Sequence, residues 1–76
     1  MEKERILKDI KLFEENTRMF DDEKWKNNKV IEMARRYYDD AKYYLSKKDF
    51  FTAFGCINYA HGLVDAIRME EFKGEK

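Results

Sequence analysis

Residues 49–68, DFFTAFGCINYAHGLVDAIR, form the most apolar segment of this chain. When this segment is wound as an α-helix at about 100° per residue, most of its circumference is apolar. Its broad aliphatic arc consists of Ala53, Cys56, Ile57, Ala60, Leu63, Val64 and Ile67. Such a helix must be enclosed by other elements. We therefore expect this segment to be sequestered on nearly all sides, at the centre of the fold.

Two more helical patterns precede this segment, and no strand pattern is visible. Apolar residues at helical spacing predict a helix over residues 2–20 and a second over residues 23–47, with Asp21 or Asp22 as its N-cap. An unbroken helix through residues 20–23 stays open, because neither glycine nor proline marks the boundary. Asp49 is a good N-cap for a third helix over residues 49–71, and residues 73–76 are expected to form a frayed tail.

The short connection before Asp49 requires the second and third helices to be antiparallel. The sequence therefore predicts one all-α domain over residues 1–76, an antiparallel up-down-up three-helix bundle.

Composition excludes several classes of partner. The 76 residues include sixteen basic and sixteen acidic side chains, spread evenly, so the cationic surface of a nucleic-acid binder is missing. No membrane span is expected, because Asn58, His61 and Asp65 interrupt the apolar segment. A lone Cys56 cannot form an internal disulfide, and the N-terminus lacks an apolar signal region. We expect a cytoplasmic protein.

Polar side chains follow one side of the third helix, and they have two interpretations. They are Asn58, His61, Asp65 and Arg68. In the first interpretation they form an internal polar seam that hydrogen-bonds the hydroxyls of Tyr37, Tyr38 and Tyr44. In the second they hold a small ligand or a metal.

A stable zinc site needs three or four protein ligands, and the chain has one histidine, so we predict neither a metal nor a cofactor. His61 also has no nucleophile near it along the helix, so we predict no enzyme activity.

Small residues on the second and third helices predict a close-packing seam. Its members are Gly55, Gly62, Ala66, Ala34 and Ala41. Each glycine costs about 1 kcal/mol in helix propensity. That cost is tolerable where a tyrosine ring of the second helix, or a second subunit, packs closely against the glycine.

Apolar residues expected to point outward from the first two helices predict an interface. The candidate interface residues are Leu12, Met19, Trp25, Arg36 and Tyr43. Exposed apolar and aromatic residues on so charged a chain are typical of protein contact surfaces. The first hypothesis is therefore a non-catalytic interaction module that docks on a protein partner or on itself, with a homodimer plausible. The alternative is a small-ligand or metal-binding protein that uses Asn58, His61 and Asp65.

Several strings within residues 30–68 form a recognisable pattern. They are Ala34-x-x-Tyr37, Asp40-Ala41-x-x-Tyr44-Leu45, Asp49, Ala53-Phe54 and Tyr59-Ala60-His61-Gly62-Leu63-Val64-Asp65-Ala66. This pattern resembles the archaeal domain of unknown function 357 family, which consists of short helical proteins. The resemblance implies a left-handed three-helix bundle and an archaeal, intracellular setting. It implies no activity, because none is established for the family.

Overall fold

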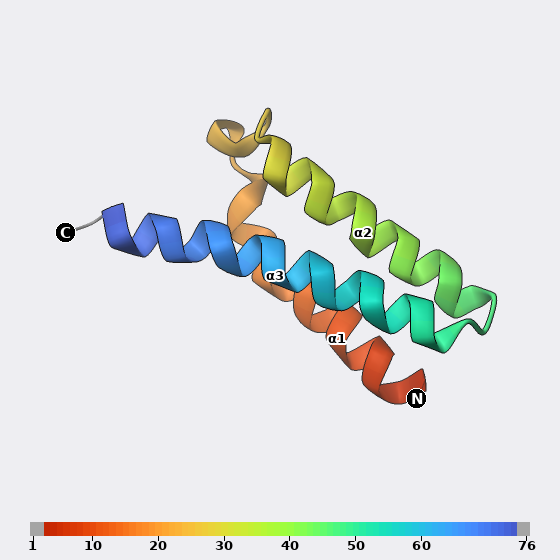
Figure 1. Ribbon diagram of the computed structural model, residues 1–76. Helices are drawn as coiled ribbons and strands as arrows, with labels where there is room; N and C mark the ends of the chain where they lie inside the picture. Colours follow the sequence, from red (N-terminus) through yellow and green to blue (C-terminus); the bar gives the residue numbers. More distant parts are fainter. Residues whose placement is uncertain (1–2, 75–76) are drawn as a thin grey trace.

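The computed structural model describes residues 3–74, which form three α-helices and two short 3-10 helices (Figure 1). The elements in chain order are α1 (Lys3–Asn16), η1 (Arg18–Asp21), η2 (Glu23–Trp25), α2 (Lys29–Ser46) and α3 (Phe50–Gly74). The predicted all-α, three-helix class is confirmed, and residues 3–74 contain no strand. The left-handed twist stays a prediction.

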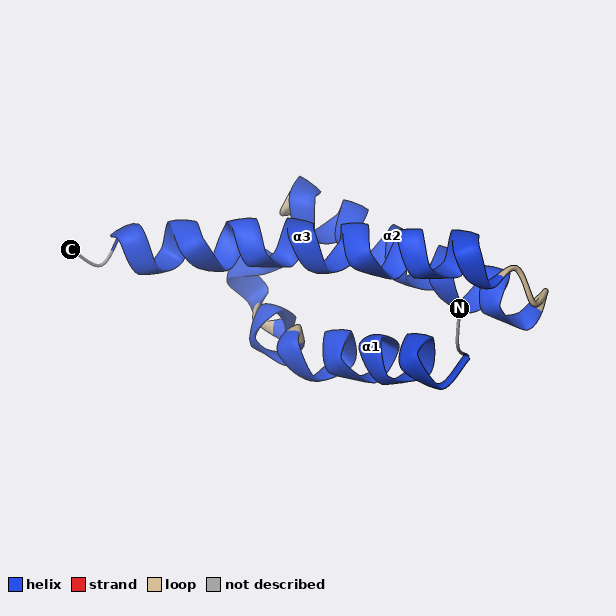
Figure 2. Cartoon of the chain, turned by 60° about the horizontal axis from the view of Figure 1, so that its bottom comes forward, coloured by secondary structure: helices blue, strands red, loops and turns tan. Residues whose placement is uncertain are grey.

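α2 and α3 lie side by side and run in opposite directions, and α1 packs against both (Figures 1 and 2). The molecule is elongated, measuring 42 × 22 × 16 Å along its principal axes. None of the helices in residues 3–74 combines the length and the hydrophobicity that a bilayer span requires.

The connection between α1 and α2 differs from the prediction. α1 ends at Asn16, where the hydroxyl of Thr17 donates to the carbonyl of Phe13 at 2.8 Å. The predicted start of the second helix at residue 23 is wrong, because α2 begins only at Lys29. Its N-cap is Asn28 rather than Asp21 or Asp22: the side-chain oxygen of Asn28 accepts from the amides of residues 30 and 31 at 2.9 and 3.0 Å. The predicted helix start at residue 2 lies outside the described residues.

The turn between α2 and α3 is tight. The amide of Lys48 donates to the carbonyl of Leu45 at 3.0 Å, and the amide of Asp49 donates to the carbonyl of Tyr44 at 2.9 Å. Asp49 then caps α3, as predicted, by accepting from the amide of Thr52 at 3.2 Å. α3 continues through Gly74, so a frayed tail starting at residue 73 is wrong. Residues 75 and 76 lie outside the described part of the chain.

One hydrophobic core joins the three helices. Its buried members are Ile6, Ile10, Phe13, Phe20, Ile31, Ala34, Ala41, Ala53, Ile57, Ala60 and Val64. Both small residues predicted on the second helix, Ala34 and Ala41, belong to this core. The aliphatic arc of α3 contributes four of its members, so that arc faces α1 and α2.

The opposite half of α3 is uncovered. Ten residues there are exposed: Phe51, Thr52, Gly55, Asn58, Tyr59, Gly62, Asp65, Ala66, Met69 and Glu70. We refer to these ten residues as the α3 outer face. The expectation that the third helix is sequestered on nearly all sides is therefore wrong. In a three-helix bundle each helix has only two neighbours, and these cover about half of its circumference.

Candidate functional site

The four polar residues predicted to form a seam do not converge. Asn58 and Asp65 are exposed on the α3 outer face, whereas His61 and Arg68 are half-buried on a neighbouring side of the helix. Only His61 fastens α3 to another element: its Nε2 donates to the backbone carbonyl of Asp9 at 2.8 Å. An internal seam that includes Asn58 and Asp65 is therefore wrong, because both face solvent.

The hydroxyl of half-buried Tyr38 has a different partner from those predicted. Tyr38 stacks on Phe13, with ring centroids 4.9 Å apart, and its hydroxyl donates to the carboxylate of Glu14 on α1. Burial, followed by this hydrogen bond, raises the pKa of Tyr38 above its ordinary value. Glu14 of α1, and not a polar residue of α3, therefore accepts the hydrogen bond of the Tyr38 hydroxyl. Glu14 was missed because a solvated glutamate gives no sequence signal for such a contact.

The described side chains offer little to a metal ion or to nucleophilic chemistry. Within residues 3–74, and apart from the side chains that the structure leaves undescribed, no group of three or more histidine, cysteine, aspartate and glutamate side chains could hold a metal. Burial raises the pKa of the Cys56 thiol, and the negative charges of Asp40 and Asp49 raise it further. A thiol that keeps its proton is a weak nucleophile and a weak metal ligand.

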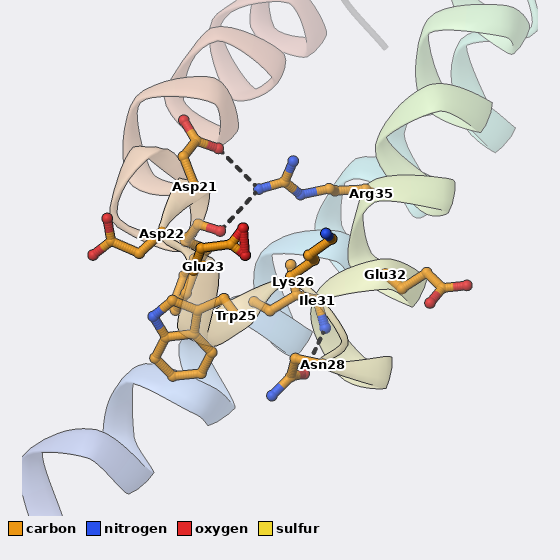
Figure 3. A pocket seen from close by; sticks show the side chains of 10 residues that line it. Asp21, Asp22, Glu23, Trp25, Lys26, Asn28, Ile31, Glu32 and Arg35 are labelled. Carbon is orange, nitrogen blue, oxygen red and sulfur yellow. Dashed lines mark hydrogen bonds and ion pairs between the residues drawn. The ribbon is translucent and has the colours of Figure 1, made fainter.

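A hollow of about 360 Å³ lies where η1 and η2 meet α2 (Figure 3). Arg35 reaches across it to the carboxylate of Asp21 at 3.1 Å and to the carbonyl of Phe20 at 3.5 Å. The guanidinium is thus already paired. The other charged residues that line the hollow are three acidic ones and one basic one: Asp22, Glu23, Glu32 and Lys26. These contacts tie the connection to α2 and leave little positive charge for an anionic ligand.

Trp25 also belongs to this hollow, which corrects its predicted outward position. Its ring is half-buried and meets Phe20 edge-to-face, with ring centroids 4.8 Å apart. The correction follows from the later start of α2, because Trp25 lies in η2 and not on the α2 surface.

The other predicted interface residues are exposed, but they are divided among three elements. Leu12 lies on α1, Met19 on η1 and Tyr43 on α2. Arg36 of α2 is paired with Glu32 one turn before it, at 3.4 Å. These residues stay candidates for contacts with a partner.

The two most exposed large apolar side chains lie elsewhere, on the α3 outer face, and Tyr59 lies there with them. Phe51 is 73% exposed, Met69 70% and Tyr59 51%. The ring of Tyr59 rests on Tyr37 of α2, with centroids 4.6 Å apart, so it is held in place. Residues 50–64 contain no lysine, arginine, aspartate or glutamate, although such residues make up 42% of the chain. The combination of exposed aromatic and aliphatic surface with absent charge is characteristic of contact surfaces.

Gly55 and Gly62 lie along the middle of this face. A Cβ added at either glycine would meet nothing within 4 Å. The predicted packing of a tyrosine ring of α2 over these glycines therefore does not occur within the chain. An open apolar hollow of about 630 Å³ lies over Gly55, with Phe51 and Tyr59 among its walls. The sequence placed Gly55, Gly62 and Ala66 in one close-packing seam, but it gave no sign that this part of α3 faces solvent.

Comparison with known proteins finds a match to a family whose function is unknown. The model of a family described as "Protein of unknown function (DUF357)" matches residues 3–72. The match covers α1 as well as the α2–α3 hairpin. No curated protein matches this chain.

Proposed function

The chain belongs to the DUF357 family of proteins of unknown function, and we propose that it is a non-catalytic protein-interaction module. The α3 outer face is its contact surface. We further propose an archaeal, cytoplasmic setting, on the basis of the family resemblance and the lone cysteine.

One observation supports this proposal above the others: the two most exposed large apolar side chains, Phe51 and Met69, share one face of one helix with Tyr59. Phe51 and Tyr59 alone expose about 250 Å² of aromatic surface, if each ring offers about 200 Å² when fully accessible. Met69 extends this surface by almost three further turns. Charged residues make up 42% of the chain, so a solvated helix face would be expected to carry some of them. The absence of charge from the fifteen residues 50–64 is instead typical of a contact surface.

The ligand-binding alternative receives no such support. The ring of His61 is engaged by the backbone of α1, and Asn58 and Asp65 are exposed to solvent.

Photo-cross-linking tests the proposal. Phe51 and Met69 are replaced, one at a time, by p-benzoylphenylalanine, which is tolerated because both side chains are exposed. The full chain is irradiated both as purified protein and inside cells that produce it. We expect discrete protein adducts from both positions, because a docked partner lies against them. A probe at Glu15, on the exposed surface of α1, is the control and should give none.

A probe at Leu12 compares the α1 surface with the α3 outer face under the same conditions. Adducts from Leu12 and none from Phe51 or Met69 would transfer the contact surface to α1. The absence of discrete adducts from all these positions, in solution and in cells, would overturn the proposed function.

A further inference from the structure

We propose that the occupant of the α3 outer face is a second copy of this chain, packed antiparallel about a two-fold axis midway between Ala60 and His61. This inference rests on the proposed function and identifies its partner. It is carried by the spacing, the side-chain sizes and the charges of the face.

The spacing is that of a seam between two packed helices. Residues Thr52, Gly55, Tyr59, Gly62, Ala66 and Met69 of the outer face recur at alternating intervals of three and four. This interval keeps one line of side chains toward a partner helix over several turns. α1 and α2 occupy the other side of α3, so a partner helix meets no obstacle within the described chain.

Side-chain sizes are complementary when the second helix runs in the opposite direction. With the axis at residues 60–61, position 59 lies opposite position 62 of the second copy. The ring of Tyr59 then covers Gly62 of the second copy, where the chain itself leaves open space. Ala66 lies opposite Gly55, and Met69 lies opposite Thr52, beside the apolar hollow over Gly55. A parallel pair would instead place Tyr59 against Tyr59 and glycine against glycine.

Charges select the same direction. The two charged residues of the face, Asp65 and Glu70, both lie in its C-terminal half. Its N-terminal end is preceded by the exposed residues Lys47, Lys48 and Asp49, which carry a net charge of +1. Antiparallel packing places Glu70 within one turn of those lysines on the second copy. It also places Asp65 near the amide of Asn58 of the second copy, which can donate to it. A parallel pair would oppose like charges along the seam, and the helix dipoles also favour the antiparallel pair.

The size of the face indicates a weak dimer. From Phe51 to Glu70 the face is about 30 Å long and about 10 Å wide. Two such strips bury about 600 Å², which is below the roughly 1,000 Å² of a stable interface and is typical of a weak, transient contact. We therefore expect a dissociation constant on the order of 100 micromolar.

Gly62→Leu is the decisive variant. In the single chain nothing lies within 4 Å of a Cβ at this position, and leucine is a better helix former than glycine, so folding is retained or improved. In the dimer the leucine occupies the space of the partner's Tyr59. Sedimentation equilibrium should show wild-type protein passing from 9.3 kDa to twice that mass with rising concentration. Gly62→Leu should weaken this association at least tenfold while its circular dichroism and melting temperature do not fall.

The control is Glu15→Leu, which adds an exposed leucine on α1 and should leave the association unchanged. Wild-type protein that stays monomeric at several hundred micromolar, or a Gly62→Leu variant that associates as tightly as wild type, would overturn the inference. Cross-links from Phe51 and Met69 to a different protein would then still support the proposed function.

The direction of packing has its own test. In a Cys56→Ala background, Thr52→Cys and Met69→Cys proteins are oxidised separately and as a mixture. Antiparallel packing predicts a disulfide only in the mixture, because in either variant alone the two cysteines are about 25 Å apart, beyond the reach of a disulfide. Disulfide formation by each variant alone would show a parallel pair and overturn the antiparallel arrangement.

Discussion

At the scale of single residues, Lys48 is the one non-glycine position in residues 3–74 with a left-handed backbone, at φ 64°. Its amide and that of Asp49 bond back to the last turn of α2, which is the hydrogen-bond pattern of a Schellman motif. Glycine favours this conformation, because a Cβ costs about 1–2 kcal/mol there.

We therefore expect Lys48→Gly to raise the free energy of unfolding by about 1 kcal/mol, after allowance for the greater freedom of glycine in the unfolded chain. For a chain of this size that gain raises the melting temperature by about 4–8 °C. Urea and thermal unfolding measure it. Lys47→Gly is the matched control. The φ of Lys47 is −88°, so no backbone strain is relieved there, and the greater freedom of glycine in the unfolded chain should lower the free energy of unfolding. Equal effects of the two substitutions would contradict the conclusion that the left-handed backbone of Lys48 is strained.

At the scale of the element, the start of α2 is fixed by Asn28. Its side-chain oxygen accepts from two amides of the first turn, which would otherwise lack partners. We expect Asn28→Ala to lower the free energy of unfolding by about 1 kcal/mol, and Asn28→Asp to retain most of the stability. Chemical denaturation followed by circular dichroism measures both variants.

The neighbouring Asn27 supplies the control for this prediction. It is exposed, and Asn27→Ala should change stability by about 0.5 kcal/mol or less. A loss at Asn27 as large as that at Asn28 would show that the cap does not set the start of α2.

At the scale of the whole molecule, Phe13 connects the three helices. It is 2% exposed, it stacks on Tyr38 of α2, and it meets the ring of His61 of α3 edge-to-face at 5.6 Å. Phe13→Ala should cost about 3–5 kcal/mol, because it removes the ring and leaves a cavity. This is a large part of the 5–15 kcal/mol that stabilises a typical domain. We expect a variant that is partly unfolded or unfolds at low urea concentration.

Leu12→Ala is the comparison for Phe13. Leu12 is the preceding residue on the same helix but is 44% exposed, so its truncation should cost about 1 kcal/mol or less. Similar losses at the two positions would contradict the packing of α1 against the α2–α3 hairpin.

Periodicity predicted the buried residues well where local pattern and packing agree. Ile6, Ile10 and Phe13 recur at helical spacing along α1, and all three are buried. The cap at Asp49 could also be predicted, because capping depends on residues adjacent in sequence. The start of α2 could not, since Asp21, Asp22 and Asn28 are all good caps. Which of the three caps the helix depends on how η1 and η2 pack. In the structure Trp25 packs against Phe20, and Arg35 pairs with Asp21.

The sequence by itself therefore determined that the chain forms three helices, where the α2–α3 turn lies, and which arc of α3 contributes to the core. These features depend on intervals of three and four residues and on local hydrogen bonds, and both are set by residues that are close together in the sequence. Only the tertiary structure decided that the arc with Gly55, Tyr59 and Gly62 faces solvent. An arc of small and aromatic residues suits a core and a contact surface equally, and which of the two it becomes depends on how many helices are available to cover it.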